Sequence, residues 1–206
     1  KMPFISNGTT ILDNGAFQAS LGALTLISTN TGSNVSSINI TSGIDSTYPI
    51  YMLEITNLRS ASGANLLINF SSDGGSNYNV TKTTTAFVAS NHEPGGEAPS
   101  SHFTYSSGYD LAQSSADLYL ATINKGGIHT GTDGGIAGNI FLYEPSSTTY
   151  VKHFQSRIHS HSEYPGASDC YVAGYLNTTS AVNAVTFKAL AQNCYGTIKL
   201  YGIKDS

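Results

Sequence analysis

The sequence predicts an all-β protein: an N-terminal anchoring arm at residues 1–20, followed by one antiparallel β-sandwich of jelly-roll type at residues 21–206. Short runs in which apolar and polar residues alternate recur along the chain, whereas apolar residues at helical spacing are scarce. Turn residues separate almost all of these runs, as is typical of sandwiches and barrels. Because no helical pattern stands between the runs, a parallel α/β sheet is excluded.

The expected strands follow from this alternation. In PIYMLEITNL, for example, Tyr51, Leu53 and Ile55 share one face while Glu54 and Thr56 point the other way. In chain order the predicted strands are ALTLIST (23–29), VSSINIT (35–41), PIYMLEITNL (49–58), NLLINF (65–70), NVTKTTTAFVAS (79–90), DLYLATI (117–123), GNIFLYE (138–144), YVKHFQSRIH (150–159), CYVAGY (170–175), NAVTFKALA (183–191) and GTIKLYGI (196–203).

Two Asp-Gly-Gly stretches are interpreted as turns. DGGS at 73–76 joins two of the strand-like runs, and its glycines favour the positive φ angles of a hairpin. A phosphate-binding loop would need a helix and a Lys after the last Gly, and a calcium loop would need several acidic residues at alternating positions. The second Asp-Gly-Gly, at 133–135, also precedes a predicted strand.

The longest interval without a predicted strand covers residues 91–116. This length exceeds an ordinary connection, so we expect a surface excursion or a short helical turn near YDLAQ at 109–113.

Composition limits the partners of the chain. With 206 residues, 11% charged residues and a net charge of −4, it suits one domain and offers no basic surface for phosphates, so no nucleic acid is expected. No apolar run reaches the roughly 18 residues of a membrane span, so no membrane insertion is expected. Cys170 and Cys194 are too few for a disulfide scaffold, and we expect both to be reduced and buried.

One pair of histidines has metal-ligand spacing. In a strand, His159 and His161 lie on the same side, about 7 Å apart, and two imidazoles at this distance can chelate a transition metal. One chain supplies only two ligands there, so a metal site requires three copies that meet at a threefold axis. The alternative is a polar strand face in solvent.

No enzymatic motif is present, and neither catalysis nor a cofactor is expected. Asp110 with Asp117, or Glu93 with Glu97, can be written as an acid–base pair, but solvated loop carboxylates explain both pairs without chemistry. No nucleophile elbow accompanies the many serines.

Tyrosines in Asn- and Gly-rich loops suggest a second kind of site, because their rings can stack on sugars. The candidates are Tyr105, Tyr109, Tyr164 and Tyr195, and His102 lies in the same long loop as the first two. The alternative is that His102, Tyr105 and Tyr109 form a contact between subunits.

Several stretches resemble a group of virion proteins of tailed bacteriophages, many of them from marine phages. The resemblance runs along nearly the whole chain in the same order and is carried by ILDNGAFQASLGALTLIST, IDSTYPIYMLEITNL, INFSSDGGSNYNVT, YEPSSTTYVKHFQSR, AGYLNTTSAVNAVTFK and GTIKLYGI. It implies a β-rich, non-enzymatic virion component: a capsid decoration protein, a head fibre or part of a tail fibre. No catalytic residues come with it.

From this resemblance and the composition we expect a capsid-surface decoration or head-fibre protein that assembles in the host cytoplasm and resides on the virion surface. A homotrimer is expected, with the major capsid protein or other virion proteins as partners. Apolar residues of the arm are expected to dock the protein: Phe4, Ile5, Ile11, Leu12 and Phe17. The alternative is a tail-fibre or lectin-like module that recognises a host surface glycan.

Overall fold

The computed structural model describes residues 4–6, 9–13, 16–17, 24–92, 103–121, 134–161 and 166–204. Within the first seventeen residues it describes the backbone and, of the side chains, only that of Ile5. In the described parts of the chain, no helix is long and apolar enough to cross a membrane.

The chain is an antiparallel β-sandwich, as the alternation of its sequence predicts. Its strands are β1 (Phe4–Ser6), β2 (Thr9–Asp13), β3 (Ala16–Phe17), β4 (Leu24–Val35), β5 (Ile38–Ile40), β6 (Ile50–Ser60), β7 (Leu66–Ser71), β8 (Lys82–His92), β9 (Phe103–Tyr105), β10 (Leu118–Tyr119), β11 (Ile136–Tyr143), β12 (Lys152–His161), β13 (Gly166–Leu176), β14 (Ala184–Ala189) and β15 (Cys194–Ile203). A single 3-10 turn, η1 (Ser107–Tyr109), follows β9.

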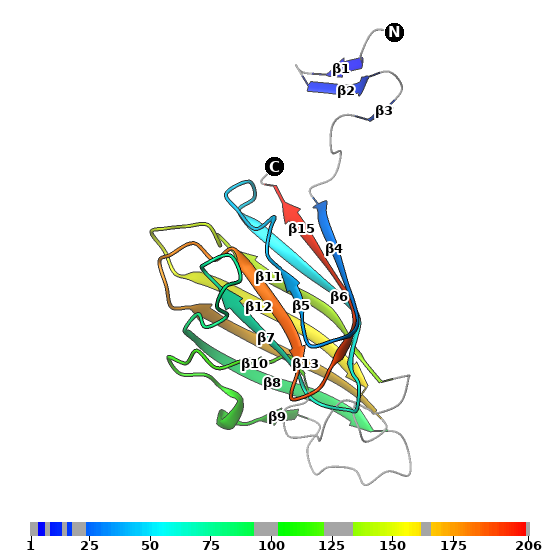
Figure 1. Ribbon diagram of the computed structural model, residues 1–206, viewed down its shortest axis with the longest axis vertical. Coiled ribbons are helices and arrows are strands. Elements are labelled where there is room, and N and C mark those ends of the chain that lie inside the picture. The colour runs from blue at the N-terminus through cyan, green and yellow to red at the C-terminus, as the bar shows by residue number, and fades with distance from the viewer. Residues whose placement is uncertain are drawn as a thin grey trace.

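Two sheets form the sandwich. The larger has the order β4-β15-β6-β11-β12-β13-β8-β9 and the smaller has the order β10-β7-β14-β5. The smaller sheet lies over the larger one (Figure 1). Strands β1, β2 and β3 pair only with one another, in a third small sheet that includes part of the predicted arm. We call the side of the larger sheet that points away from the smaller sheet the outer face.

The core lies between the two facing sheets. Successive side chains of a strand point to opposite faces of the sheet. From Lys152 to Ser160 of β12, buried and exposed residues therefore alternate without exception. Phe154 of the larger sheet meets Phe70 of the smaller one with ring centroids 5.4 Å apart. The other fully buried core residues include Leu53, Ile55, Leu66, Ile68, Ile140, Leu142, Ile158, Val172, Val185, Phe187, Ile198 and Leu200. Both cysteines are free and buried, as expected.

Two lysines are buried at the core-facing side of the larger sheet. Lys82 donates hydrogen bonds from Nζ to the carbonyl oxygens of Val80 (3.0 Å) and Ala116 (2.7 Å). Lys152 does the same to Tyr150 and Thr178, both at 3.0 Å. Burial lowers the pKa of Lys152, and it lowers that of Lys82 to about 8. Each ammonium thus fastens a loop to a strand end.

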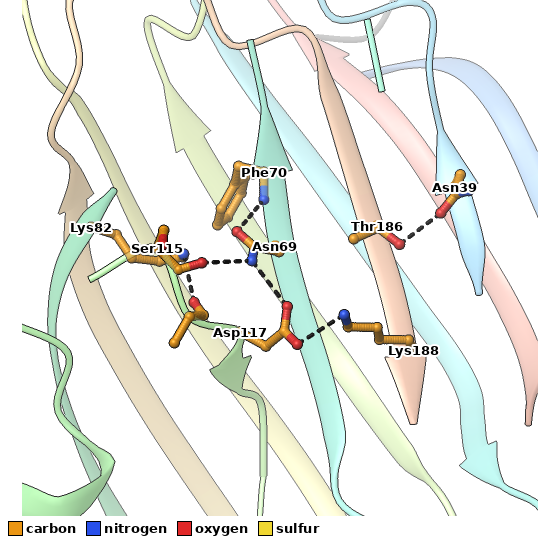
Figure 2. Close-up of polar contacts among 9 residues, drawn as sticks. Asn39, Asn69, Phe70, Lys82, Ser115, Asp117, Thr186 and Lys188 are labelled. Atoms are coloured by element: carbon orange, nitrogen blue, oxygen red, sulfur yellow. Dashed lines mark hydrogen bonds and ion pairs between the residues drawn. The ribbon is translucent and has the colours of Figure 1, made fainter. Parts of the chain in front are cut away.

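A polar network fastens the segment before β10 to the smaller sheet (Figure 2). Asn69 of β7 donates from Nδ2 to the Ser115 carbonyl oxygen (3.1 Å) and to Asp117 (2.9 Å). Asp117 also forms an ion pair of 2.8 Å with Lys188 of β14. The Asp117 carboxylate is therefore bound by two neighbouring strands.

A bulge bends the centre of the larger sheet. Asn57 of β6 has a φ of 48°, and the pairing of β6 with both β11 and β15 shifts register near it. Gly138 of β11 and Gly196 of β15 lie at these register shifts, where Gly138 approaches the backbone of β12 and Gly196 approaches that of β6. A Cβ on Gly138 would lie 2.2 Å from the Arg157 carbonyl oxygen, and one on Gly196 would lie 2.6 Å from the Leu58 Cα. Only glycine fits this close backbone approach.

The structure corrects part of the sequence interpretation. Gly74 and Gly75 have the expected positive φ angles of 72° and 88°, but the turn is not a hairpin, because β7 and β8 belong to different sheets. The predicted strand at 117–123 is a strand only at Leu118–Tyr119 among its described residues. The interval at 91–116 contains a strand, β9, which pairs with β8 and is not among the predicted strands. The helical turn expected near YDLAQ is confirmed as η1, which ends at Tyr109, the first residue of that stretch.

Candidate functional site

The outer face of the larger sheet carries a groove over four adjacent strands. Register aligns the outward side chains of β8, β13, β12 and β11 into rows that cross the sheet. The middle row begins with the short side chains Thr85 and Ala173 and continues through Gln155 to Phe141. On β13 and β12 the flanking rows carry the bulkier side chains, Tyr171 and Arg157 on one side and Tyr175 and His153 on the other, so the middle row forms a floor between two walls. We call this hollow the outer groove.

One wall is a ladder of stacked groups. Phe87 stacks on Tyr171 with centroids 4.9 Å apart and planes within 13°. Phe103 of β9 packs on the other side of Phe87 at 5.2 Å. The Arg157 guanidinium lies 5.3 Å from the Tyr171 centroid, which extends the ladder by a cation–π contact. Each member of this wall therefore contacts the next one.

The other wall is formed by the next row along the strands. Tyr175 and His153 oppose each other across β13 and β12, with ring centroids 6.3 Å apart. Tyr143 of β11 lies beside them. The groove consists of two adjoining hollows of about 460 and 450 Å³ that share Thr85, Gln155 and Ala173. These volumes are in the range of small-molecule sites.

The charges at the groove compensate each other. Arg157 donates to Asp169 from Nε (3.0 Å) and Nη2 (2.7 Å), and this hydrogen bonding holds the pKa of the Asp169 carboxyl below its ordinary value. The Tyr171 hydroxyl donates to the same carboxylate at 3.1 Å. Among the described residues that line the two hollows, Arg157 is the only one with a fixed charge. The groove therefore presents aromatic surface, amides and a neutralised ion pair.

At the edge of the larger sheet, Tyr105 lies opposite Phe87 and belongs to the outer face. Its hydroxyl donates to Asp110 Oδ2 at 2.6 Å, and the other oxygen of Asp110 accepts the backbone N–H of Ala86 at 3.0 Å. The hydrogen bond to Asp110 is the largest cause that raises the pKa of Tyr105, whereas a hydrogen bond with the Thr85 side chain lowers this pKa. Tyr105 thus lies near the end of the groove floor.

The structure places two other candidate tyrosines, Tyr109 and Tyr195, away from the groove. Tyr109 packs edge-on against Tyr119 at 5.4 Å and belongs to the margin of the core. Tyr195 lies under the Arg59 guanidinium, 4.2 Å from its centroid. Tyr164 and His102 lie outside the described residues.

The histidine pair occupies the outer face of β12 beyond the Phe87–Tyr171 wall. His159 is exposed and His161 is half-buried, as expected for alternate residues of a strand. Within the described ranges, no group of three or more His, Cys, Asp and Glu side chains could hold a metal ion. A metal bound between subunits by His159 and His161 stays a prediction.

The predicted docking residues are in part described. Ile5 is 54% exposed. Phe4, Ile11, Leu12 and Phe17 lie in β1, β2 and β3, but their side chains are outside the described part of the structure. Their role in docking stays a prediction.

The carboxylates that the sequence offered as an acid–base pair have structural partners. Asp110 binds Tyr105 and the backbone of β8, whereas Asp117 binds Asn69 and Lys188. Glu93 and Glu97 lie outside the described residues.

Sequence reasoning missed most of the groove. Phe87, Phe141 and Tyr171 were placed in strands, but their alignment depends on which strands pair and in what register. One signal for the groove is visible in the sequence: alternation puts aromatic residues on the outward face of these strands, two positions along from the short Thr85 and Ala173.

No protein-family model, curated protein or solved structure matches the chain. Function must therefore be argued from the site, since a β-sandwich supports many functions. The groove is the feature of the described residues from which such an argument can start.

Proposed function

We propose that this chain is a non-enzymatic component of a tailed-phage particle and that its outer groove binds a glycan. The observation that carries the glycan proposal is a groove whose floor starts at the short Thr85 and Ala173 and ends at the Phe141 ring, with aromatic walls and planar polar groups. Sugar rings present apolar C–H faces and a rim of hydroxyls. The aromatic walls can pack against the C–H faces of a sugar ring. The polar groups of Asn139, Gln155 and the Arg157–Asp169 pair can form hydrogen bonds with its hydroxyls.

The fold supports a division between framework and site. We infer that eight strands form a jelly roll, because they pair in nested order: β4 with β15, β5 with β14, β6 with β11, and β7 with β10. Strands β8, β9, β12 and β13 are then two insertions that extend the larger sheet. Three of these inserted strands carry the groove, as expected where binding elements are added to a stable framework.

The setting on a phage particle rests on the resemblance described above and on composition. Few charged residues and many Ser, Thr and Asn suit a surface that must avoid unspecific binding outside a cell. We propose a homotrimer on the virion, held by the segment from Phe4 to Phe17 against the major capsid protein or another virion protein. The groove favours a tail-fibre or receptor-binding role over pure capsid decoration, because decoration needs no ligand site.

A glycan array tests the binding proposal. We expect saturable binding by the wild-type chain and at least a tenfold loss in Phe141→Ala, which removes the ring at the end of the groove floor. Tyr150→Ala is the matched control, because Tyr150 is 70% exposed and lines neither hollow. The absence of binding to any glycan would refute the proposal.

The virion assignment needs its own test. We expect a trimeric mass in light scattering of the purified chain and density for it on the surface of the intact particle by cryo-electron microscopy. A monomer that is missing from particles contradicts the assignment, whatever its glycan affinity.

A further inference from the structure

We propose that the ligand of the outer groove is an uncharged, linear oligosaccharide that lies across the strands, from Tyr105 at the sheet edge toward Phe141. The inference rests on the proposed glycan function and specifies the charge, the shape and the direction of the ligand. Three features of the groove carry it.

The direction follows from the register. Thr85, Ala173 and Gln155 pair directly across β8, β13 and β12, so the low floor runs perpendicular to the strands. The bulky rows stand parallel to this floor on both sides. A chain laid along a strand would have to cross the Phe87–Tyr171 stack, whereas a chain laid across the strands follows the floor.

The length follows from the strand spacing. The proposed path runs from Tyr105 on β9 to Phe141 on β11, which is four inter-strand spacings or about 19 Å. A disaccharide leaves part of this length empty, a tetrasaccharide fills it, and longer chains extend past its ends. Affinity should therefore rise with chain length and then stop rising.

The charge follows from the Arg157–Asp169 pair. Asp169 neutralises the fixed positive charge in the wall at 2.7 Å, and the amides of Gln155 and Asn139 are neutral. An acidic sugar would have to compete with Asp169 for Arg157, whereas neutral hydroxyls can bond to both partners of the intact pair.

The test measures the affinity of the full chain for neutral and acidic oligosaccharide series from disaccharide to hexasaccharide by calorimetry. The neutral probes are β-glucan, mannan and galactan fragments, and the acidic probes are alginate and sulfated galactan fragments. For a neutral series we expect at least a tenfold gain from disaccharide to tetrasaccharide and less than twofold beyond it. Salt should change this affinity by less than twofold, because no net charge is involved.

Variants at the two ends of the floor test the direction. Tyr105→Ala at the edge and Phe141→Ala at the far end should each remove most of the gain with length, because each removes an aromatic ring, whereas His159→Ala, beyond the wall, should not. Circular dichroism establishes that each variant is folded.

The outcomes separate this inference from the proposed function. Glycan binding that does not depend on length, that depends on His159 instead of Tyr105, or that selects acidic chains overturns the inference and leaves the glycan function standing. If no saccharide binds, both fail. If Phe141→Ala changes the oligomeric mass and leaves saccharide affinity unchanged, the face is a subunit interface and the inference is wrong.

Discussion

Lys82 makes the stability of this protein depend on pH in a direction that can be calculated. Its ammonium is fully buried against two carbonyl oxygens, and burial lowers its pKa from 10.5 to about 8. Between these values the unfolded chain binds more protons than the folded one, so stability rises with pH. From about pH 7 to about pH 9.5 this adds about 2 kcal/mol to the free energy of unfolding, at 1.36 kcal/mol per pKa unit.

The buried cysteines act in the opposite direction. Burial raises the pKa of Cys170 from 9.0 to about 12, so the folded chain keeps a proton that the unfolded chain loses. This costs about 1 kcal/mol over the same pH interval, and Cys194, whose pKa burial also raises, adds to the loss. The wild-type chain should therefore change little, and only variants reveal the two contributions.

The assay is urea unfolding followed by far-ultraviolet circular dichroism at both pH values. The measured quantity is the change in the free energy of unfolding from the lower to the higher pH. This change should be about 2 kcal/mol smaller in Lys82→Met than in the wild type, and about 1 kcal/mol larger in Cys170→Ala. Comparing each variant with itself at two pH values cancels the packing effect of the substitution. The reasoning is refuted if Lys82→Met and the wild type change by the same amount within about 0.5 kcal/mol.

Three further substitutions test the fold. Gly138→Ala should cost about 3 kcal/mol or more in urea unfolding, because its Cβ would lie 2.2 Å from the Arg157 carbonyl oxygen of β12. Gly108→Ala is the control and should cost less than about 1 kcal/mol, because the nearest atom to its Cβ would be 3.7 Å away. Equal costs contradict the close approach of β11 and β12 at Gly138. Ser168→Ala should leave stability unchanged or raise it by about 1 kcal/mol, because its buried hydroxyl has no hydrogen-bond partner within the described structure; a clear loss means that the hydroxyl is satisfied. Asp73→Asn should lower the free energy of unfolding near neutral pH, because hydrogen bonds from Ser71 and Asn77 stabilise the Asp73 carboxylate and lower its pKa to about 2. The difference from the wild type should vanish as the pH falls through that value. A difference that persists in acid argues against a contribution of the carboxylate.

The strands of the sandwich could be predicted because each has its own signal. Alternation in YVKHFQSRIH predicts a strand with Lys152, Phe154, Ser156 and Ile158 on one face; the structure confirms the strand and shows that this face is the buried one. The short β9 could not be predicted, because three residues are too few to show alternation. The prediction of a hairpin at DGGS is wrong, because turn residues do not specify which strands pair.

The groove could not be predicted because it depends on register across non-consecutive strands. Phe87 and Tyr171 are 84 residues apart in the sequence, and they stack only because β8 joins the free edge of the β12–β13 hairpin. Loop tyrosines are visible in the sequence as candidates, and among those that the structure describes only Tyr105 lies near the groove. Residue type alone therefore indicates a chemistry but cannot say which side chains lie side by side.

The most direct test of the central claim is a crystal structure of the chain with the tightest-binding oligosaccharide from the array. The account predicts sugar density over Thr85, Ala173 and Gln155, between the Phe87–Tyr171 stack and the Tyr175–His153 pair. Sugar density at Tyr195, or an empty groove in a crystal grown at saturating saccharide, would contradict it.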